Sequence, residues 1–203
     1  ATSSAGVVRV LVLGDSGAKF LGAAMRHAQH DGREMVAERG VGSCSVLRGD
    51  VSPLEDGGAS HGTSCADRWV RDVDELRPDV TLVVLGGAFL TTKACSEDFR
   101  SAYEARLDDL LTAMGDRAGR VVVARIPLPM GRWRWGDVVG RVRCLNAILD
   151  EAARTHALAS LDLHALVCPT LACDDTRDGK AMRPDGLHFD GAGQCVKGDF
   201  VKD

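Results

Sequence analysis

Short, continuously apolar runs alternate with longer amphipathic stretches along this chain, and this alternation limits the possible folds more than any other feature. Continuous apolar runs are typical of strands covered on both faces, because a half-exposed strand alternates apolar with polar residues. We expect five strands, within the segments VVRVLVLG (7–14), EMVAERGVG (34–42), DVTLVVLGG (79–87), RVVVARIPL (120–128) and LASLDLHAL (158–166). We expect helices over Ala18–His30, Cys65–Leu76, Ser96–Met114 and Val138–His156.

This order of elements predicts a three-layer α/β/α sandwich of the flavodoxin-like type, with a central parallel sheet of about five strands. In the third helix, one face collects the large apolar residues Phe99, Tyr103, Leu107, Leu110 and Leu111. We expect one domain over residues 1–203, with residues 1–6 as a linker or trimmed remnant. The Gly- and Ser-rich stretch 47–64 is expected to be irregular.

Composition and motifs exclude several classes of function. The net charge of −4 and the scattered basic residues argue against a nucleic-acid partner. No apolar run is long enough for a membrane span, and the opening ATSSAG lacks the features of a signal peptide. Neither phosphate-binding loop, GxGxxG or GxxxxGK[ST], occurs, and GxSxG fails because Ala18 replaces its second glycine. No cofactor is predicted.

A serine stands where the first strand ends and the first helix begins. Ligands of such sheets bind at the carboxyl ends of the strands, so Ser16 is a candidate nucleophile if a base reaches it. His188 is the histidine with a carboxylate at useful spacing, since Asp185 precedes it by three residues. Asp185 could orient the imidazole as in a Ser-His-Asp triad, or it could simply cap a helix while His188 packs.

Seven cysteines are many for a cytosolic chain of this length, so disulfides in an oxidising compartment are preferred over reduced thiols. Local spacing favours the pairs Cys44–Cys65 and Cys168–Cys173. The odd count leaves at least one of three others unpaired within the chain: Cys95, Cys144 and Cys195. His61 and Cys65 lack a second ligand pair at zinc spacing, so no metal site is predicted.

The segments GDSG (14–17) and RPDGLHF (183–189) resemble the first and last motif blocks of the SGNH (GDSL-like) hydrolases. More narrowly, VCPTLAC (167–173) with DGKAMRPDGLHFDGAG (178–193) resembles the SGNH domains fused behind membrane acyltransferases of family three, which modify cell-surface glycans. GVGSCSVL (40–47) and the segment 65–89 are similar to the same subgroup. The resemblance covers most of the chain.

The resemblance implies roles for single residues. Ser16 matches the nucleophile, His188 the general base and acid, and Asp185 the third triad member. The backbone N–H groups of Ser16 and Gly42 match oxyanion donors, with Gly40 as the alternative to Gly42.

One family motif is missing. The family has GxND after the middle strand, where the asparagine donates to the oxyanion, but this chain has GGAF (86–89). The only asparagine, Asn146, lies in a predicted helix. Gly87 is the candidate replacement donor, and the resembled subgroup often lacks the asparagine too.

The implied function is serine-dependent acyl transfer, of O-acetyl groups in particular, or ester hydrolysis on a cell-surface carbohydrate. The partners would be an acyl donor, a carbohydrate acceptor and an upstream membrane acyltransferase domain in an extracytoplasmic location, with a cytoplasmic one left open. The rivals are a stand-alone carboxylesterase and a weakly active glycan-binding or scaffolding domain.

Four residues are further candidates for contacts with substrate. Asp15 precedes the predicted nucleophile, and Arg132, Trp133 and Trp135 lie in PMGRWRWGD (129–137). Flat aromatic rings and arginines in this loop could receive a sugar ring. The loop could equally pack on its own domain or on an absent neighbour.

Overall fold

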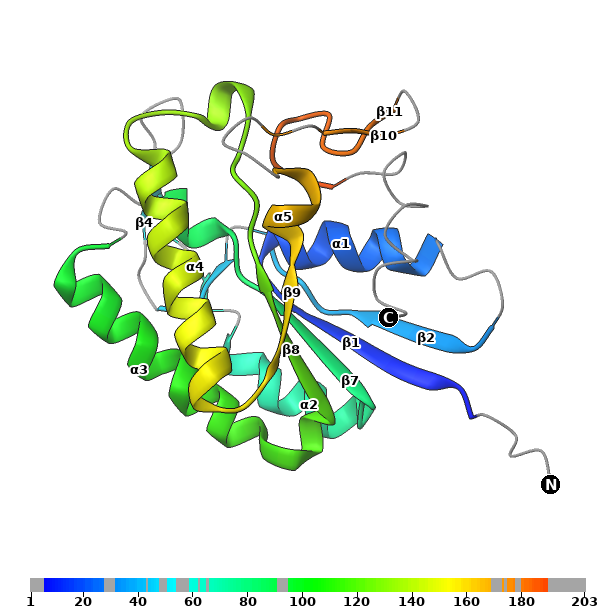
Figure 1. The fold of residues 1–203 in the computed structure, drawn as a ribbon. Helices are drawn as coiled ribbons and strands as arrows, with labels where there is room; N and C mark the ends of the chain where they lie inside the picture. The colour runs from blue at the N-terminus through cyan, green and yellow to red at the C-terminus, as the bar shows by residue number, and fades with distance from the viewer. Residues whose placement is uncertain are drawn as a thin grey trace.

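Five parallel strands form the central sheet of the protein (Figure 1), for which we describe a computed structural model. The structure describes residues 6–27, 32–42, 44–47, 51–53, 59–61, 63–64, 66–90, 95–168, 173, 175–177 and 180–189. The strands of the sheet are β1 (Val8–Gly14), β2 (Glu34–Glu38), β7 (Val80–Val84), β8 (Arg120–Arg125) and β9 (Ala159–Asp162). Their order across the sheet is β2-β1-β7-β8-β9.

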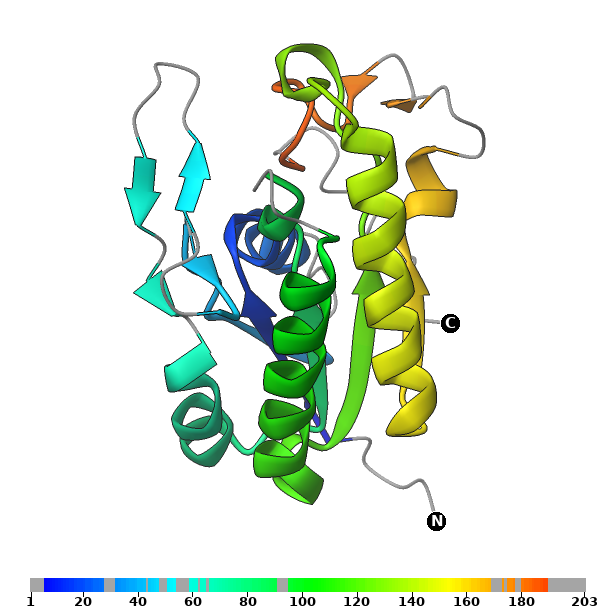
Figure 2. The same ribbon diagram turned by 90° about the vertical axis from the view of Figure 1, so that its left-hand side faces the viewer.

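Helices cover both faces of this sheet. Helix α1 lies on one face, and α2, α3 and α4 lie on the other (Figures 1 and 2). The α-helices are α1 (Ser16–His27), α2 (Trp69–Leu76), α3 (Glu97–Met114), α4 (Val138–Thr155) and α5 (Leu163–Val167). The 3-10 turns are η1 (Ala66–Arg68), η2 (Gly87–Leu90), η3 (Gly115–Ala118) and η4 (Gly131–Trp133). The predicted α/β/α architecture is confirmed.

Strand β1 is buried inside the sheet and has a neighbouring strand on each side. Residues 10–14 are buried, as the continuous apolar run predicts. Strand β2 pairs with one side of β1 and β7 with the other, and Gly14 at the end of β1 is level with Val84 at the end of β7. The strand order therefore reverses at β1 and β7, which is where ligands of open α/β sheets bind.

The apolar face predicted for the third helix is also confirmed. In α3 the five predicted residues are buried, and Met114 extends the same face. The helix begins at a cap, because the Ser96 side chain accepts a hydrogen bond from the N–H of Phe99.

Among the described residues, no helix combines the length and apolar character that crossing a bilayer requires.

Four local expectations differ from the structure. The helix predicted from Cys65 to Leu76 is α-helical only from Trp69, after the 3-10 turn η1. The apolar segment 158–166 is a strand only as far as Asp162, whose carboxylate accepts the N–H of Ala165 and caps α5. Helix α1 begins at Ser16 rather than Ala18. The stretch 47–64, predicted to be irregular, contains the short antiparallel pair β4 (Val51–Pro53) with β5 (Ala59–His61). It also contains β6 (Thr63–Ser64), which pairs with β3 (Cys44–Ser45) just before the stretch. A further pair is β10 (Thr176–Arg177) with β11 (Lys180–Ala181).

Candidate active site

Ser16 is placed by a sharp turn between β1 and α1. A Cβ on Gly14 would lie 1.8 Å from the carbonyl oxygen of Val84, and Gly14 has a φ of +139°, so glycine is required at this position. The N–H of Asp15 donates to the same Val84 carbonyl at 3.3 Å. Ser16 is the first residue of α1, where the helix N-terminus favours negative charge.

The structure brings Ser16, His188 and Asp185 together. The Oγ of Ser16 lies 2.9 Å from Nε2 of His188, although the two residues are 172 positions apart in the sequence. Nδ1 of His188 lies 2.7 Å from Oδ2 of Asp185. The chain hydroxyl–imidazole–carboxylate is the arrangement that activates a serine nucleophile.

Asp185 both caps backbone N–H groups and orients the imidazole of His188, the two roles that the sequence left as alternatives. Its Oδ1 accepts the backbone N–H groups of Leu187 at 2.8 Å and His188 at 2.7 Å, as a cap would, while Oδ2 faces the imidazole. Partial burial favours the neutral carboxyl, but these two N–H groups and the imidazole outweigh it and lower the pKa of Asp185. The carboxylate is therefore held ionised beside His188.

The loop that carries Asp185 and His188 is fastened to the segment after β8. The N–H of Met130 donates to the carbonyl of Gly186 at 2.8 Å, and the indole N–H of Trp133 donates to the carbonyl of Asp185 at 2.9 Å. Gly186 has a φ of +80°, and a Cβ there would lie 2.6 Å from the Met130 carbonyl oxygen. Only glycine permits this close approach.

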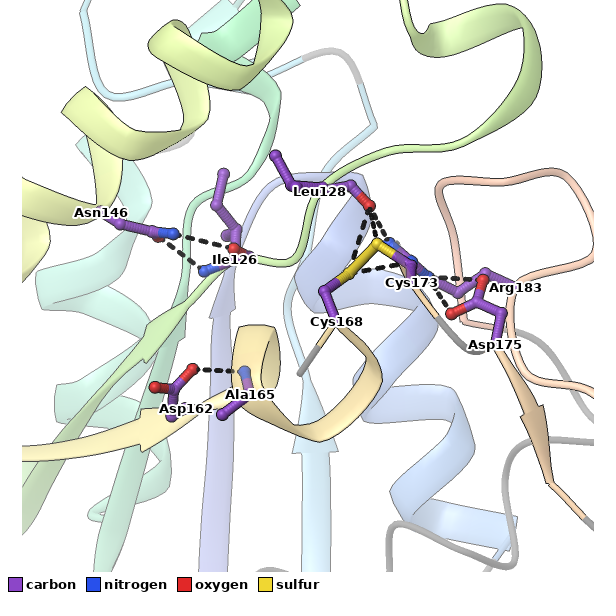
Figure 3. Close-up of a disulfide and its surroundings, with 9 residues drawn as sticks. All are labelled: Ile126, Leu128, Asn146, Asp162, Ala165, Cys168, Cys173, Asp175 and Arg183. Carbon is purple, nitrogen blue, oxygen red and sulfur yellow. Dashed lines mark hydrogen bonds and ion pairs between the residues drawn. A yellow bond between two sulfur atoms is a disulfide. The ribbon is translucent and has the colours of Figure 1, made fainter. Parts of the chain in front are cut away.

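The side chain of Arg183, at the start of the same loop, is buried and holds the loop through polar contacts (Figure 3). Arg183 is 1% exposed, and its Nε lies 2.9 Å from both carboxylate oxygens of Asp175. Its Nη1 donates to the carbonyl of Leu128 at 2.8 Å. The sulfurs of the Cys168–Cys173 disulfide lie 3.8 and 3.6 Å from that same oxygen. The guanidinium of Arg183 and the disulfide therefore both contact the Leu128 carbonyl, next to the loop that carries His188.

A small cavity opens beside Ser16 and His188. Its volume is about 50 Å³. Its walls come from the carboxyl ends of β7 and β8 and from the start of α5, and its apolar lining includes Val84, Phe89, Ile126, Leu163 and Phe189. A small apolar cavity against a nucleophile fits the acyl part of an ester.

Comparisons with known proteins support this architecture. No protein-family model matches the chain, and no curated protein matches its sequence. A lipase/acylhydrolase from Enterococcus faecalis has a similar structure, with 17% identity, a TM-score of 0.63, and coverage of 96% of this chain and 93% of that one. A GDSL-like lipase from Bacteroides thetaiotaomicron matches at 15% identity and a TM-score of 0.64, covering 96% of this chain and 85% of that one.

An acetylxylan esterase from Geobacillus stearothermophilus, Axe2, is also similar, with 14% identity, a TM-score of 0.64, and coverage of 98% and 94%. Two structures of that esterase are of catalytic mutants, one with a serine and one with a histidine replaced by alanine. The chain has the fold of the GDSL-like hydrolases.

The substrate contact expected of Asp15 finds no support in its surroundings: Asp15 lines the cavity, but both of its carboxylate oxygens accept backbone N–H groups. It is 2% exposed, and its Oδ1 accepts the N–H of Gly17 at 2.8 Å while Oδ2 accepts the N–H of Gly87. Burial raises the pKa of the Asp15 carboxyl, although the surrounding backbone N–H groups oppose the rise. Asp15 ties the end of β1 to the turn after β7.

The same contact corrects the expectation for Gly87. Its N–H is engaged by Asp15 and is not available to an oxyanion. Gly42 lies in an exposed turn, and the other candidate, Gly40, packs closely on Lys19 of α1. Among the described residues, no acceptor pairs with the N–H of Ser16, so this backbone group is available to an oxyanion.

Asn146 has a different use. Its Oδ1 accepts the N–H of Ile126 at 2.8 Å, and its Nδ2 donates to the Ile126 carbonyl at 2.9 Å (Figure 3). The buried amide therefore satisfies the backbone where β8 ends.

The tryptophan loop packs on its own molecule. Trp133 is held on Asp185, and the guanidinium of Arg132 lies 5.0 Å from the centre of the Trp133 ring. Arg141 lies 4.3 Å from the centre of the Trp135 ring and donates to the carbonyls of Trp135 and Phe89. These contacts favour the packing alternative over the sugar-binding one.

The predicted disulfide Cys168–Cys173 is confirmed, and a second one joins Cys95 to Cys144. Cys44 is disulfide-bonded. Its expected partner Cys65, like Cys195, lies outside the described residues.

The sequence did not single out Phe20. This residue lies on α1, four positions after Ser16, and its ring centre is 4.5 Å from that of His188. The spacing could have shown that Phe20 lies on the same face of α1 as Ser16, because residues four apart share a helical face. The contact between Phe20 and His188 could not be predicted, since it joins distant parts of the sequence.

Proposed function

We propose that this protein is an SGNH-type serine esterase or O-acyltransferase that acts on acyl esters of carbohydrates. The observation that carries the proposal is the hydrogen-bonded chain from Ser16 Oγ through His188 to Asp185, at 2.9 and 2.7 Å. It lies at the strand-order reversal and next to a small apolar cavity.

In the first half of the reaction, Ser16 Oγ attacks the carbonyl carbon of the ester while Nε2 of His188 takes the hydroxyl proton. Asp185 holds the other side of the imidazole and stabilises the imidazolium. The N–H of Ser16 and the positive end of α1 face the developing oxyanion. The bond to the alcohol oxygen then breaks, His188 returns the proton to that oxygen, and an acyl-serine remains.

In the second half, His188 removes a proton from water or from a sugar hydroxyl. The resulting oxygen attacks the acyl-serine, the bond to Ser16 Oγ breaks, and the serine regains its proton. Water gives hydrolysis, and a sugar hydroxyl gives acyl transfer.

Ala88 stands where the family motif has its asparagine, so one oxyanion donor is missing. Such a loss typically costs about 2.7–4 kcal/mol in the transition state. We therefore expect slow turnover of simple esters. Slow hydrolysis of the acyl-serine suits a transferase, because the acyl group then remains on the enzyme for transfer to a sugar hydroxyl.

The proposed substrate is an acetyl ester, and the proposed acceptor is an extracytoplasmic carbohydrate. The similarity to an acetylxylan esterase and the two disulfides among the described residues support this choice. A membrane acyltransferase domain upstream would be the donor partner that the sequence resemblance implies.

The test is the hydrolysis of 4-nitrophenyl acetate by the wild type and by Ser16→Ala. We expect kcat to fall by about 10⁶-fold, the order found when a serine nucleophile of a triad is removed. Ser101→Ala, which removes an exposed hydroxyl on α3, is the matched control and should match the wild type. Equal rates for wild type and Ser16→Ala would refute the proposal.

A further inference from the structure

We propose that Phe20 is the platform on which the alcohol half of the ester lies, and that this half is a pyranose ring. The inference rests on the proposed function and extends it to the residue that selects the alcohol.

The first observation is the exposure of Phe20. Its relative exposure is 38%, and only three other large apolar residues of the described chain are comparably exposed: Val7, Val8 and Met35. Those three lie where β1 and β2 begin, at the opposite edge of the sheet from Ser16. Phe20 is the one of the four that lies at the active site.

The second observation is the contact with the general base. The phenyl ring and the imidazole of His188 are tilted by 35° with their centres 4.5 Å apart. Nε2 of the same imidazole faces Ser16. Because His188 must give its proton to the leaving alcohol oxygen, that oxygen lies beside a ring that Phe20 already touches.

The third observation places the acyl half elsewhere. Ser16 and His188 line the cavity, but Phe20 does not. The cavity is small, with a volume of about 50 Å³ and a mostly apolar lining, which suits an acetyl or another short acyl chain. The ester therefore divides at the serine, with the acyl group inside the cavity and the alcohol outside it, on the side of Phe20.

The chemistry of a phenyl face selects among alcohols. The face of the ring carries negative electrostatic potential, and the axial C–H groups of a pyranose present a flat, weakly positive, apolar surface. Methanol is too small to cover the ring. A linear alkyl chain covers it without matching its flat face.

The experiment compares acetate esters that differ only in their alcohol: methyl acetate, hexyl acetate and a monoacetylated xylo-oligosaccharide. For each enzyme, kcat/KM on the sugar ester is divided by kcat/KM on methyl acetate. We expect this ratio to fall about 3- to 10-fold in Phe20→Ala and to be kept by Phe20→Tyr. Met35→Ala, which removes another exposed apolar side chain, is the control and should keep the wild-type ratio.

Two outcomes would overturn the inference. If kcat falls equally on all three esters, Phe20 only orients His188. If the hexyl ester is affected as strongly as the sugar ester, the surface is a general apolar one.

A binding measurement separates this inference from the proposed function. In a Ser16→Ala background, calorimetry gives the Kd of the acetylated oligosaccharide with and without Phe20→Ala, and no turnover is needed. We expect the Kd to rise about 3- to 10-fold, and an unchanged Kd would contradict the platform. Absence of ester turnover by the wild type would instead count against the proposed function alone.

Discussion

The two sides of the candidate active site are built in different ways. Ser16 is fixed by the turn between β1 and α1, and this turn is tied to the end of the neighbouring strand β7 through Val84 and Gly87. The loop with Asp185 and His188 follows no strand of the central sheet and is held by side chains and carbonyls distant in sequence. Trp133 is 52 positions from its partner Asp185, and Leu128 is 55 positions from its partner Arg183.

This difference shows which parts of the sequence determine the positions of the nucleophile and of its base. The nucleophile depends on the local turn and on the pairing of β1 with β7, and it can be recognised from a short motif. The base depends on tertiary contacts, so substitutions far from residues 183–189 can misplace it. Substitutions on the two sides of the site should therefore lower activity in different ways.

Among the substitutions that test this comparison, Asp185→Asn should have the largest effect. The amide should leave the imidazole in the wrong tautomer, and we expect kcat to fall by about 10²- to 10⁴-fold. Circular dichroism should show a retained fold. A kcat near the wild-type value would reduce Asp185 to a cap of the loop.

Asp185 also predicts a pH dependence of stability. Its pKa is lower in the folded protein, so its stabilising contribution is complete above the ordinary aspartate pKa of about 3.9 and is lost as the pH falls through the lower, folded pKa. The difference in unfolding free energy between wild type and Asp185→Asn should shrink as the pH drops below about 4. A difference that grows in acid would contradict this assignment.

An intermediate effect is expected from Arg183→Met, on the tertiary side of the comparison. Removing the guanidinium breaks the buried ion pair with Asp175, and the loss of one partner of a buried ion pair typically costs about 3–5 kcal/mol. We expect a lower Cm in urea and a lower kcat, because the loop above it loosens. Arg154→Met removes a solvent-exposed ion pair with Glu151 and is the matched control, which should change stability far less because exposed ion pairs contribute little. Equal effects from both variants would show that Arg183 does not hold the loop.

The smallest expected effect is that of Trp133→Phe. The variant keeps a ring in the loop and removes one hydrogen bond to the Asp185 carbonyl, worth about 1 kcal/mol, or roughly a 5-fold change in kcat. KM should change little, since the indole acts through Asp185. Trp135→Phe, which keeps a ring against Arg141, serves as the control. A rise in KM on sugar esters with unchanged kcat would restore the substrate-binding role for Trp133.

Local patterns were enough to predict the layers of the fold. Continuous apolar runs give β1, β7 and β8, and the spacing of apolar residues gives the buried face of α3. The apolar segment 158–166 was misassigned because strand and helix compete there, and the cap at Asp162 decides where the strand ends. Apolar periodicity alone cannot mark that boundary.

The candidate site divides in the same way. Ser16, Asp185 and His188 could be named from motif spacing, because each motif is short. The burial of Asp15 and its hold on Gly87 could not, since they depend on two strand ends meeting in the sheet. The pairing of Cys95 with Cys144 likewise joins segments 49 residues apart, which no local spacing reveals.

The most direct measurement is mass spectrometry of the protein after treatment with a serine-directed fluorophosphonate. A hydroxyl activated by His188 should give one adduct, on Ser16, and labelling should be largely lost in His188→Ala. An adduct on a different serine, no adduct at all, or undiminished labelling of Ser16 in His188→Ala would contradict the central claim that these two residues act as a nucleophile and its base.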